Sequence, residues 1–514
     1  MSINDNITGF APAGQITPDP ENTIDAPNTL TPDASTPIGT PDTVTPVGAG
    51  SITAPNTINP DAVNAVDAPN TLTPDAVNNV DTPNTLAPDA VNPIATPVGF
   101  APLNSEPINR VLTPLIGLNF GSQNYSVMGQ PSTFTDALTY SRASSATYVE
   151  TYVDALNRKQ KRITTVGANV PRFEDAGLLV EGASTNLMLR SEEFDDVHYA
   201  KTRATVSANS SLSPDGSFSA DKLVEDSSLG SHIIIANATI GTSTIYTFSV
   251  YVKSAGRNYV RLTESFDATR SAYFNVANGT IGTIGVNLEN ATIENVGGGW
   301  YRCSIYIDAG IGGTKDVRVY LAEDNDIISY QGNGSNGVLL WGAQVEALPF
   351  ATSYIKTEGA VVSRAADVCS APVSVSGGNY TVEAIGKDVA LPTTQSIMCL
   401  NIGNGTASLA SAYVETSNNR VRAFLALSGS TQFNFVDANN TWDVEHTLSA
   451  NFTNGSAQAF TDGESIGSDL SVSIPTYDTL YIGTLNGSAL PFYGNIKRIE
   501  IYDTVLTANE VKSL

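Results

Sequence analysis

Beyond residue 177, short runs alternate between apolar and polar residues. In the run YTFSVYVK (residues 246–253), Tyr246 and Phe248 fall on one face and the residue between them falls on the other. Successive side chains of a β-strand point to opposite faces, so this alternation predicts strands with one buried face. Asn-Gly pairs such as Asn278-Gly279 separate the runs and are typical of hairpin turns. We therefore expect an all-β protein with two antiparallel β-sandwich, jelly-roll-like domains, preceded by an extended proline-rich arm.

The composition divides the chain into four parts. Residues 1–109 hold 18 of the 27 prolines, two aromatic residues and twelve carboxylates, but no Lys, Arg or His. Such a segment is not expected to bury a core of its own. We expect an acidic arm at 1–109, a connecting β/loop region at 110–176, one sandwich at 177–367 and a second at 368–514.

The arm is a repeat. PNTLTPDA and its variants begin at Pro27, Pro41, Pro55, Pro69 and Pro83, at intervals of 14 residues. Because proline fixes φ and lacks an N–H donor, we expect turns or polyproline II rather than helix interiors or central strands.

Each repeat also keeps one aliphatic residue at the same register, and these residues are Leu30, Val44, Ile58, Leu72 and Leu86. A repeated apolar side chain predicts a repeated docking pocket, either on a particle surface or on neighbouring copies of the chain. A disordered acidic linker is the alternative interpretation.

Four predicted strands carry aromatic and basic residues together on the face turned away from the predicted core. These residues are Tyr251, Lys253, Tyr259, Arg261, Trp300, Arg302, Tyr306, Arg318 and Tyr320. Aromatic rings can stack on sugars, and Arg or Lys can bind their hydroxyl or acidic groups, so this face predicts glycan binding. The same residue types are enriched at interfaces between subunits, which is the competing interpretation.

Charge and cysteine content narrow the possible partners. The net charge of −25 leaves no basic surface of the kind that nucleic acid requires. Cys303, Cys369 and Cys399 are odd in number and widely spaced, which favours free thiols over a disulfide scaffold or a thiolate metal site. The start of the sequence lacks a signal-peptide pattern, and no run approaches the roughly 20 apolar residues of a membrane span. We expect neither nucleic-acid binding nor membrane insertion.

The sequence offers little catalytic or metal chemistry. Glu500 and Asp503 are the nearest candidate pair for glycoside hydrolysis, but their spacing places them on opposite sides of a regular strand. The histidines, which show no metal-ligand spacing, are His198, His232 and His446. The acidic residues 323–326 could hold Ca²⁺, although a solvated loop is the favoured interpretation. We expect no enzyme activity and no cofactor.

Several segments resemble a family of phage structural and tail-fibre proteins, whose central module is similar to a carbohydrate-binding jelly roll. The matching segments are residues 140–150, 168–175, 176–196, 246–256, 271–283, 296–307 and 338–367. At His198-Tyr199 the chain departs from the family, which usually carries a Trp there. The resemblance implies a virion location, and the free thiols favour assembly in the reducing cytoplasm of the host. The resemblance also implies a homotrimer that contacts other virion proteins (capsid, portal or collar, or tail) and the polysaccharide of the host surface.

The last part of the chain resembles concanavalin A-like and laminin-G-like sandwiches, in residues 460–466 and 492–514. Thr507 and Glu510 form a capping box that predicts a short terminal helix. The leading expectation is a non-enzymatic virion spike or fibre that attaches to host glycans. The alternatives are a purely structural head or tail decoration protein, whose aromatic face joins subunits, and, less favoured, a polysaccharide depolymerase.

Overall fold

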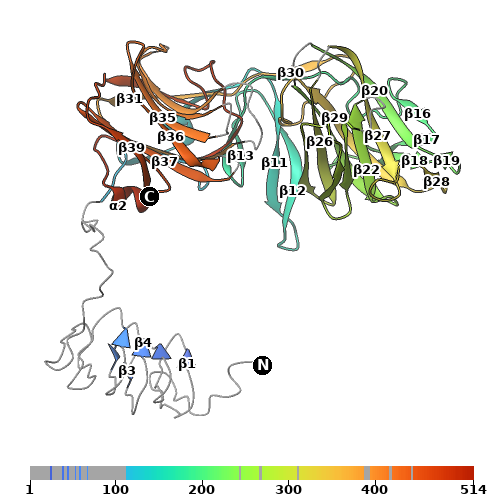
Figure 1. Cartoon of the computed structure of the whole chain (residues 1–514), viewed down its shortest axis with the longest axis horizontal. Coiled ribbons are helices and arrows are strands. Elements are labelled where there is room, and N and C mark those ends of the chain that lie inside the picture. The colour runs from blue at the N-terminus through green and yellow to red at the C-terminus, as the bar shows by residue number, and fades with distance from the viewer. Residues whose placement is uncertain are drawn as a thin grey trace. The chain divides into compact units, whose positions relative to one another are not determined.

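The computed structural model describes residues 111–514 except 242–244, 265–268, 309–311, 387–393, 404, 416–419 and 442–443, together with six two-residue strands between residues 24 and 67. The chain separates into two compact units, residues 1–105 and 106–514. In the described part of the second unit, the helices are α1 (Phe134–Ala137) and α2 (Ala508–Lys512), and antiparallel strands make up the sheets. The predicted all-β class is confirmed (Figure 1). None of the described helices has the length and apolar character needed to cross a membrane.

The C-terminal sandwich packs two sheets around a core that includes Leu118, Val382, Leu400 and Ile499. The first sheet has the order β10 (Thr139–Ser141), β31 (Val368–Val375), β40 (Tyr477–Ile482), β33 (Gln395–Asn401), β34 (Leu409–Val414), β35 (Arg420–Leu427) and β36 (Ser430–Thr441). The second has the order β39 (Glu464–Asp469), β38 (Ser456–Thr461), β37 (His446–Thr453), β32 (Gly378–Gly386), β41 (Gly494–Tyr502), β7 (Ile116–Asn119), β8 (Asn124–Val127) and β9 (Gln130–Ser132).

Residues 110–176 contribute directly to this sandwich. β7 pairs with β41, and β10 pairs with β31. β13 (Arg172–Glu174) pairs with β14 (Gly177–Val180), which also adds to β41. The region expected to be a connecting segment between the arm and the middle sandwich therefore supplies strands to the sheets of the C-terminal sandwich. β7, β10 and β13 have three or four residues each, which is too few for alternation along the sequence to assign them to a sheet.

The middle sandwich also has two sheets, and its core includes Val250, Leu262, Phe274 and Ile305. One sheet has the order β16 (Ala200–Thr202), β20 (His232–Ile240), β27 (Gly313–Ala322), β22 (Tyr259–Glu264), β23 (Ser271–Asn275) and β24 (Thr280–Ile284). The other has the order β17 (Ala204–Ser211), β18 (Ala220–Glu225), β29 (Gly337–Glu346), β21 (Ile245–Ala255), β26 (Trp300–Asp308) and β25 (Asn290–Gly297).

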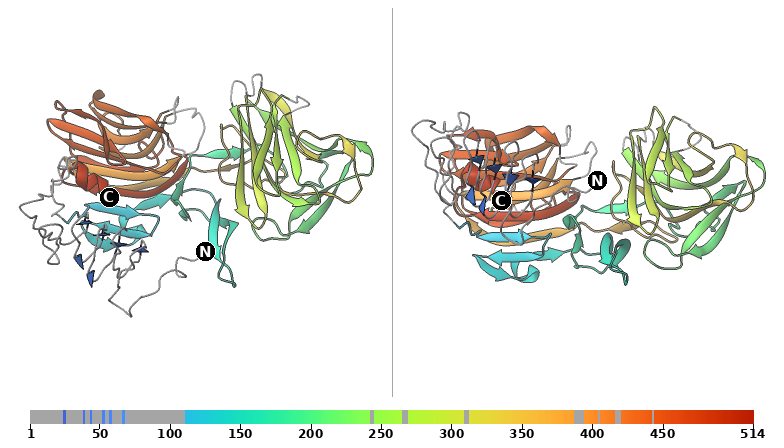
Figure 2. Two further views of the ribbon diagram at one scale, coloured as in Figure 1. Left: turned by 60° about the horizontal axis from the view of Figure 1, so that its bottom comes forward. Right: turned by 90° about the horizontal axis from the view of Figure 1, so that it is seen from below.

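Three further strand pairs complete this unit. They are β11 (Ala146–Val153) with β12 (Lys159–Val166), β15 (Ser184–Asn186) with β30 (Val362–Arg364), and β19 (Leu229–Gly230) with β28 (Tyr330–Gln331). The hairpin of β11 and β12 is a separate two-stranded ribbon beside the middle sandwich (Figures 1 and 2).

Backbone pairing in the arm follows the 14-residue repeat. β1 (Ile24–Asp25), β2 (Ile38–Gly39), β4 (Ile52–Thr53) and β6 (Val66–Asp67) pair in parallel, each 14 residues from the next. β3 (Thr43–Val44) and β5 (Thr57–Ile58) pair with the same offset. β2 and β4 are central strands, so the expectation that proline excludes them is wrong: the prolines lie between these two-residue strands. Val44 and Ile58 face each other in register, whereas Leu30, Leu72 and Leu86 lie outside the described residues.

Deleting residues 39–52 removes one whole repeat and should keep the parallel pairing, because Val66 then stands 14 residues after Ile38. Deleting residues 54–60 should break the pairing of β6, since Val66 then stands seven residues after Ile52, half a repeat out of register with β4. Hydrogen exchange at the β6 amides measures the outcome. Equal exchange rates for the two deletions would contradict register-dependent pairing.

Candidate functional site

The aromatic and basic residues predicted to share one face are divided between the two sheets of the middle sandwich. Tyr251, Lys253, Trp300, Arg302 and Tyr306 lie on β21 and β26. Tyr259, Arg261, Arg318 and Tyr320 lie on β22 and β27. Because the core lies between these sheets, their outer faces point in opposite directions. The expectation of a single shared face is therefore wrong.

Most of these side chains are also buried. Lys253 and Tyr259 are half-buried, whereas the others are at most 6% exposed. On the β21–β26 sheet, the hairpin of β11 and β12 covers the outer face, and Ile163 packs in one cluster with Trp300 and Trp341. On the opposite sheet, the guanidinium of Arg261 lies 5.8 Å from the ring of Tyr273 and 5.2 Å from that of Tyr320. Alternation identifies the outer face of a strand, but not the chain segments that cover it.

The covered face contains a buried guanidinium. Arg302 donates to the carbonyl of Thr352 at 2.5 Å and to the hydroxyl of Ser249 at 3.0 Å. These partners lie inside the same unit, so Arg302 stabilises the packing of residues 350–357 on β26. The sequence pattern alone had suggested a ligand contact.

A buried ionic network lies near the chain segments that connect the two sandwiches. Arg172 binds Glu181 at 2.7 Å and Asp367 at 2.5 Å, and Asp367 also binds Arg142 at 3.1 Å. Arg364 lies 3.4 Å from Glu181. All five side chains are at most 1% exposed. Burial opposes the charged form of Arg172, but Glu181 and Asp367 together raise its pKa, so this guanidinium stays charged.

Sequence reasoning did not identify this network. Its members come from segments that carry the family resemblance: YSRASS, PRFED, LVEGA and VSRAAD. Those segments were interpreted as signs of a module, without roles for their charged residues. Their structural role is to hold the crossing segments together.

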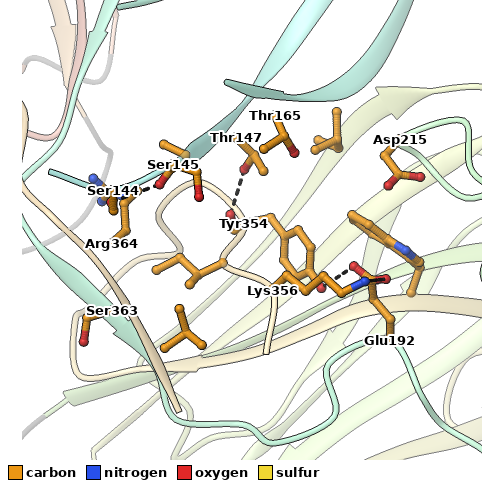
Figure 3. A pocket seen from close by; sticks show the side chains of 15 residues that line it. Ser144, Ser145, Thr147, Thr165, Glu192, Asp215, Tyr354, Lys356, Ser363 and Arg364 are labelled. Atoms are coloured by element: carbon orange, nitrogen blue, oxygen red, sulfur yellow. Dashed lines mark hydrogen bonds and ion pairs between the residues drawn. The ribbon is translucent and has the colours of Figure 1, made fainter. Parts of the chain in front are cut away.

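A hollow of about 310 Å³ lies between the β11–β12 hairpin and the middle sandwich (Figure 3). Trp341 and Tyr354 line it and are almost fully buried, at 1% and 3% exposed. The lining residues that are more exposed are Ser145, Thr165, Asp215, Lys356, Val362 and Ser363. Apolar and aromatic surface with a few placed polar groups is the usual composition of a small-molecule site.

The polar groups of the hollow are held in place by one another. Glu192 accepts from Nζ of Lys356 at 2.8 Å and from the hydroxyl of Tyr354 at 2.9 Å. Burial first, and Glu192 second, raise the pKa of Tyr354, so this phenol stays neutral and can donate. The indole N–H of Trp341 donates to Ser219 at 3.1 Å. The hollow is therefore preorganised, with a fixed aromatic lining and exposed hydroxyl, carboxylate and ammonium groups that suit a polyhydroxylated ligand.

The other sequence candidates are placed as follows. Glu500, at the end of β41, accepts from Arg498 at 3.3 Å and from Tyr502 at 3.0 Å, while Asp503 is an exposed residue just beyond the strand. His446 lies 2.7 Å from Asp462 and is partly buried. His232 is fully buried against the ring of Tyr330, 4.7 Å away. His198 is partly buried beside Tyr199.

No group of three or more His, Cys, Asp or Glu side chains in the described ranges is arranged to hold a metal ion. In the acidic loop, Asp326 accepts from Thr283 at 2.7 Å and from Asn325 at 2.8 Å. The three cysteines are free thiols, as their spacing predicted. All three are buried, and burial raises the pKa of each thiol.

Residues 363–512 match the family model described as the concanavalin A-like lectin/glucanases superfamily. This match agrees with the expected fold of the C-terminal sandwich. The comparison with curated proteins found no match.

Among solved structures, the chain is similar to the CBM40 module of an IT-sialidase from Ruminococcus gnavus bound to α2,3-sialyllactose, with 19% identity, coverage of 27% of this chain and 83% of that one, and a TM-score of 0.24. A SAP-like pentraxin from Limulus polyphemus is 15% identical over 27% of this chain and 69% of that one, with a TM-score of 0.23. The receptor-binding domain of botulinum neurotoxin type G is 14% identical over 31% and 40%, with a TM-score of 0.24.

Proposed function

We propose that this chain is a non-enzymatic glycan-binding protein of a phage virion, where it serves as a spike or fibre that attaches to host surface polysaccharide. Two sandwiches, one of them matching a lectin/glucanase superfamily model, support the glycan-binding part. The family resemblance of residues 134–367 supports the virion part.

The observation that carries the binding proposal is the hollow beneath the β11–β12 hairpin. It combines an exposed apolar side chain, Val362, with exposed hydroxyl groups at Ser145, Thr165 and Ser363, on a lining that the buried rings of Trp341 and Tyr354 hold in place. A sugar needs both features: apolar surface for its C–H face and hydrogen-bonding groups for its hydroxyls. The buried residues proposed from alternation do not offer that surface.

The arm is proposed as the anchor, bound to capsid, portal, collar or tail proteins, in a homotrimer. Its 14-residue offset between parallel strands gives a regular surface along which a partner could bind repeatedly. Val44 and Ile58 remain the docking candidates among the described strands.

Thr165→Trp tests the hollow directly. Thr165 is exposed on β12, so the larger ring should fill the hollow without disturbing a core, and we expect binding to weaken by about tenfold or more. Thr314→Trp is the matched control, because Thr314 is an exposed strand residue of the opposite sheet. The measurement is binding of the full chain and both variants to an array of bacterial surface polysaccharides.

Three results would oppose the proposal. Failure of the full chain to bind any glycan would refute the function, and equal binding by Thr165→Trp and the unsubstituted chain would refute the site. Release of reducing sugar from the bound polysaccharide would replace an attachment role with a depolymerase.

A further inference from the structure

The inner face of β12 connects the hollow described above to a second one. Residues alternate along a strand, so Lys159, Lys161, Ile163 and Thr165 share one side. Burial of Ile163 at 3% shows that this side faces the sandwich. Ile163 and Thr165 line the first hollow, and Lys159 and Lys161 line a second hollow of about 550 Å³. From Thr165 to Lys159 the strand rises about 20 Å, which is a path for several units of a linear polymer.

The second hollow is bordered by a glycine turn and by three lysines. At Gly297, whose φ is +92°, a Cβ atom would lie 2.4 Å from the carbonyl oxygen of Lys161, so glycine permits this close approach of two backbones. At Gly299, whose φ is +80°, a Cβ atom would lie 3.4 Å from Cε of Lys253. Lys161 and Lys253 are therefore brought to the same turn from two different strands.

The basic groups around this turn differ in their partners. Arg158 pairs with Asp154 at 2.8 Å, and Arg162 pairs with Glu150 at 2.7 Å. By contrast, no described carboxylate lies within 4.0 Å of the ammonium groups of Lys159, Lys161 or Lys253.

One carboxylate opposes these cations. Asp175 also lines the second hollow, and it accepts from the hydroxyl of Thr151 at 2.8 Å. Three ammonium groups against one carboxylate leave a local excess of positive charge, although the chain as a whole carries −25. Such a site selects anionic groups by charge complementarity.

We propose that the second hollow binds the anionic groups of an acidic polysaccharide whose chain runs along the inner face of β12. This inference rests on the proposed function and names its ligand class: a glycan with carboxylate or sulfate groups. The first hollow binds sugar hydroxyls and apolar faces, and the lysines of the second bind the charges.

The test uses the full chain and a panel of acidic polysaccharides (polygalacturonate, hyaluronate and a sulfated galactan) with neutral dextran and glucan. Lys159→Gln/Lys161→Gln should weaken binding to the acidic panel by about tenfold or more, because each ammonium makes a charge-assisted hydrogen bond. The dependence of affinity on salt should also decrease. Lys222→Gln/Lys512→Gln is the matched control: it removes the same charge from β18 and from α2, and should leave the affinity unchanged.

The outcomes separate this inference from the proposed function. If the chain binds neutral but not acidic glycans, the inference is overturned and the proposed function stands. The same holds if the two double variants weaken binding to the acidic polysaccharides equally. Absence of binding to any glycan overturns both. The chain could also bind a single-stranded oligonucleotide more tightly than any acidic glycan. If Lys159→Gln/Lys161→Gln loses that binding, the site belongs to nucleic acid and the inference is overturned. The inference is supported if Lys159→Gln/Lys161→Gln binds the acidic polysaccharides more weakly and the control variant does not. The melting temperature of Lys159→Gln/Lys161→Gln must equal that of the unsubstituted chain.

Discussion

Asp367→Asn is expected to destabilise the chain by about 3–5 kcal/mol, as for other buried ion pairs that lose one partner. The carboxylate of Asp367 binds Arg142 and Arg172, and all three side chains are fully buried. Asparagine keeps the volume but not the charge, so Arg142 would lose its ion-pair partner, and Arg172 would share Glu181 with Arg364. The backbone N–H of Glu181, which donates to Asp367 at 2.8 Å, would also lose a charged acceptor.

Calorimetric unfolding of the chain, together with its soluble yield, measures this effect. Asp154→Asn is the control, because Asp154 also binds an arginine but does so at the surface, and we expect no measurable change. A melting temperature for Asp367→Asn equal to that of the control would show that the network is not needed for stability.

Trp300→Ala is expected to cost about 3–5 kcal/mol, the usual range for removing a buried tryptophan. Trp300 is 2% exposed, packs with Ile163 and Trp341, and donates its indole N–H to the carbonyl of Leu212 at 3.3 Å. The cavity left by alanine would loosen the β11–β12 hairpin and with it the lining of the hollow.

Tyr259→Ala is the informative comparison for Trp300→Ala. Alternation placed both residues on outer faces, but Tyr259 is only half-buried, so its loss should cost much less. Thermal unfolding of the two variants measures the difference. Equal and small effects would mean that Trp300 does not hold the hairpin in place.

The sequence predicted the fold well because local patterns determine it. The buried face of the strand that carries Tyr246 and Phe248 was predicted correctly, since burial of one sheet face forces a period of two. The capping box at Thr507 and Glu510 was also confirmed, and it begins α2. Both features depend on residues a few positions apart.

The candidate site could not be predicted in the same way because its contacts join distant parts of the chain. Arg172 and Asp367 are 195 residues apart, and Tyr354 reaches Glu192 across 162 residues. Only the fold brings these groups together. The family resemblance did mark the segments that carry Arg172, Glu181 and Asp367, but it gave those residues no role.

In the arm, by contrast, a pattern that is visible in the sequence was missed. Its proline content predicts an extended chain, and its docking candidates belong to one aliphatic register, that of Val44 and Ile58. The structure pairs a second register as well, through Ile24, Ile38, Ile52 and Val66. This register is visible in the sequence at the same period, and two registers in each repeat are the signal that a repeat can stack on itself.

The central claim is that the β11–β12 hairpin and the middle sandwich form the glycan site. Hydrogen exchange of the full chain with and without an oligosaccharide of a polysaccharide that it binds tests it most directly. We expect the added protection to centre on residues 144–147, 163–165 and 354–356, which line the hollow. Protection confined to residues 368–514, in the lectin-like sandwich, would contradict the claim.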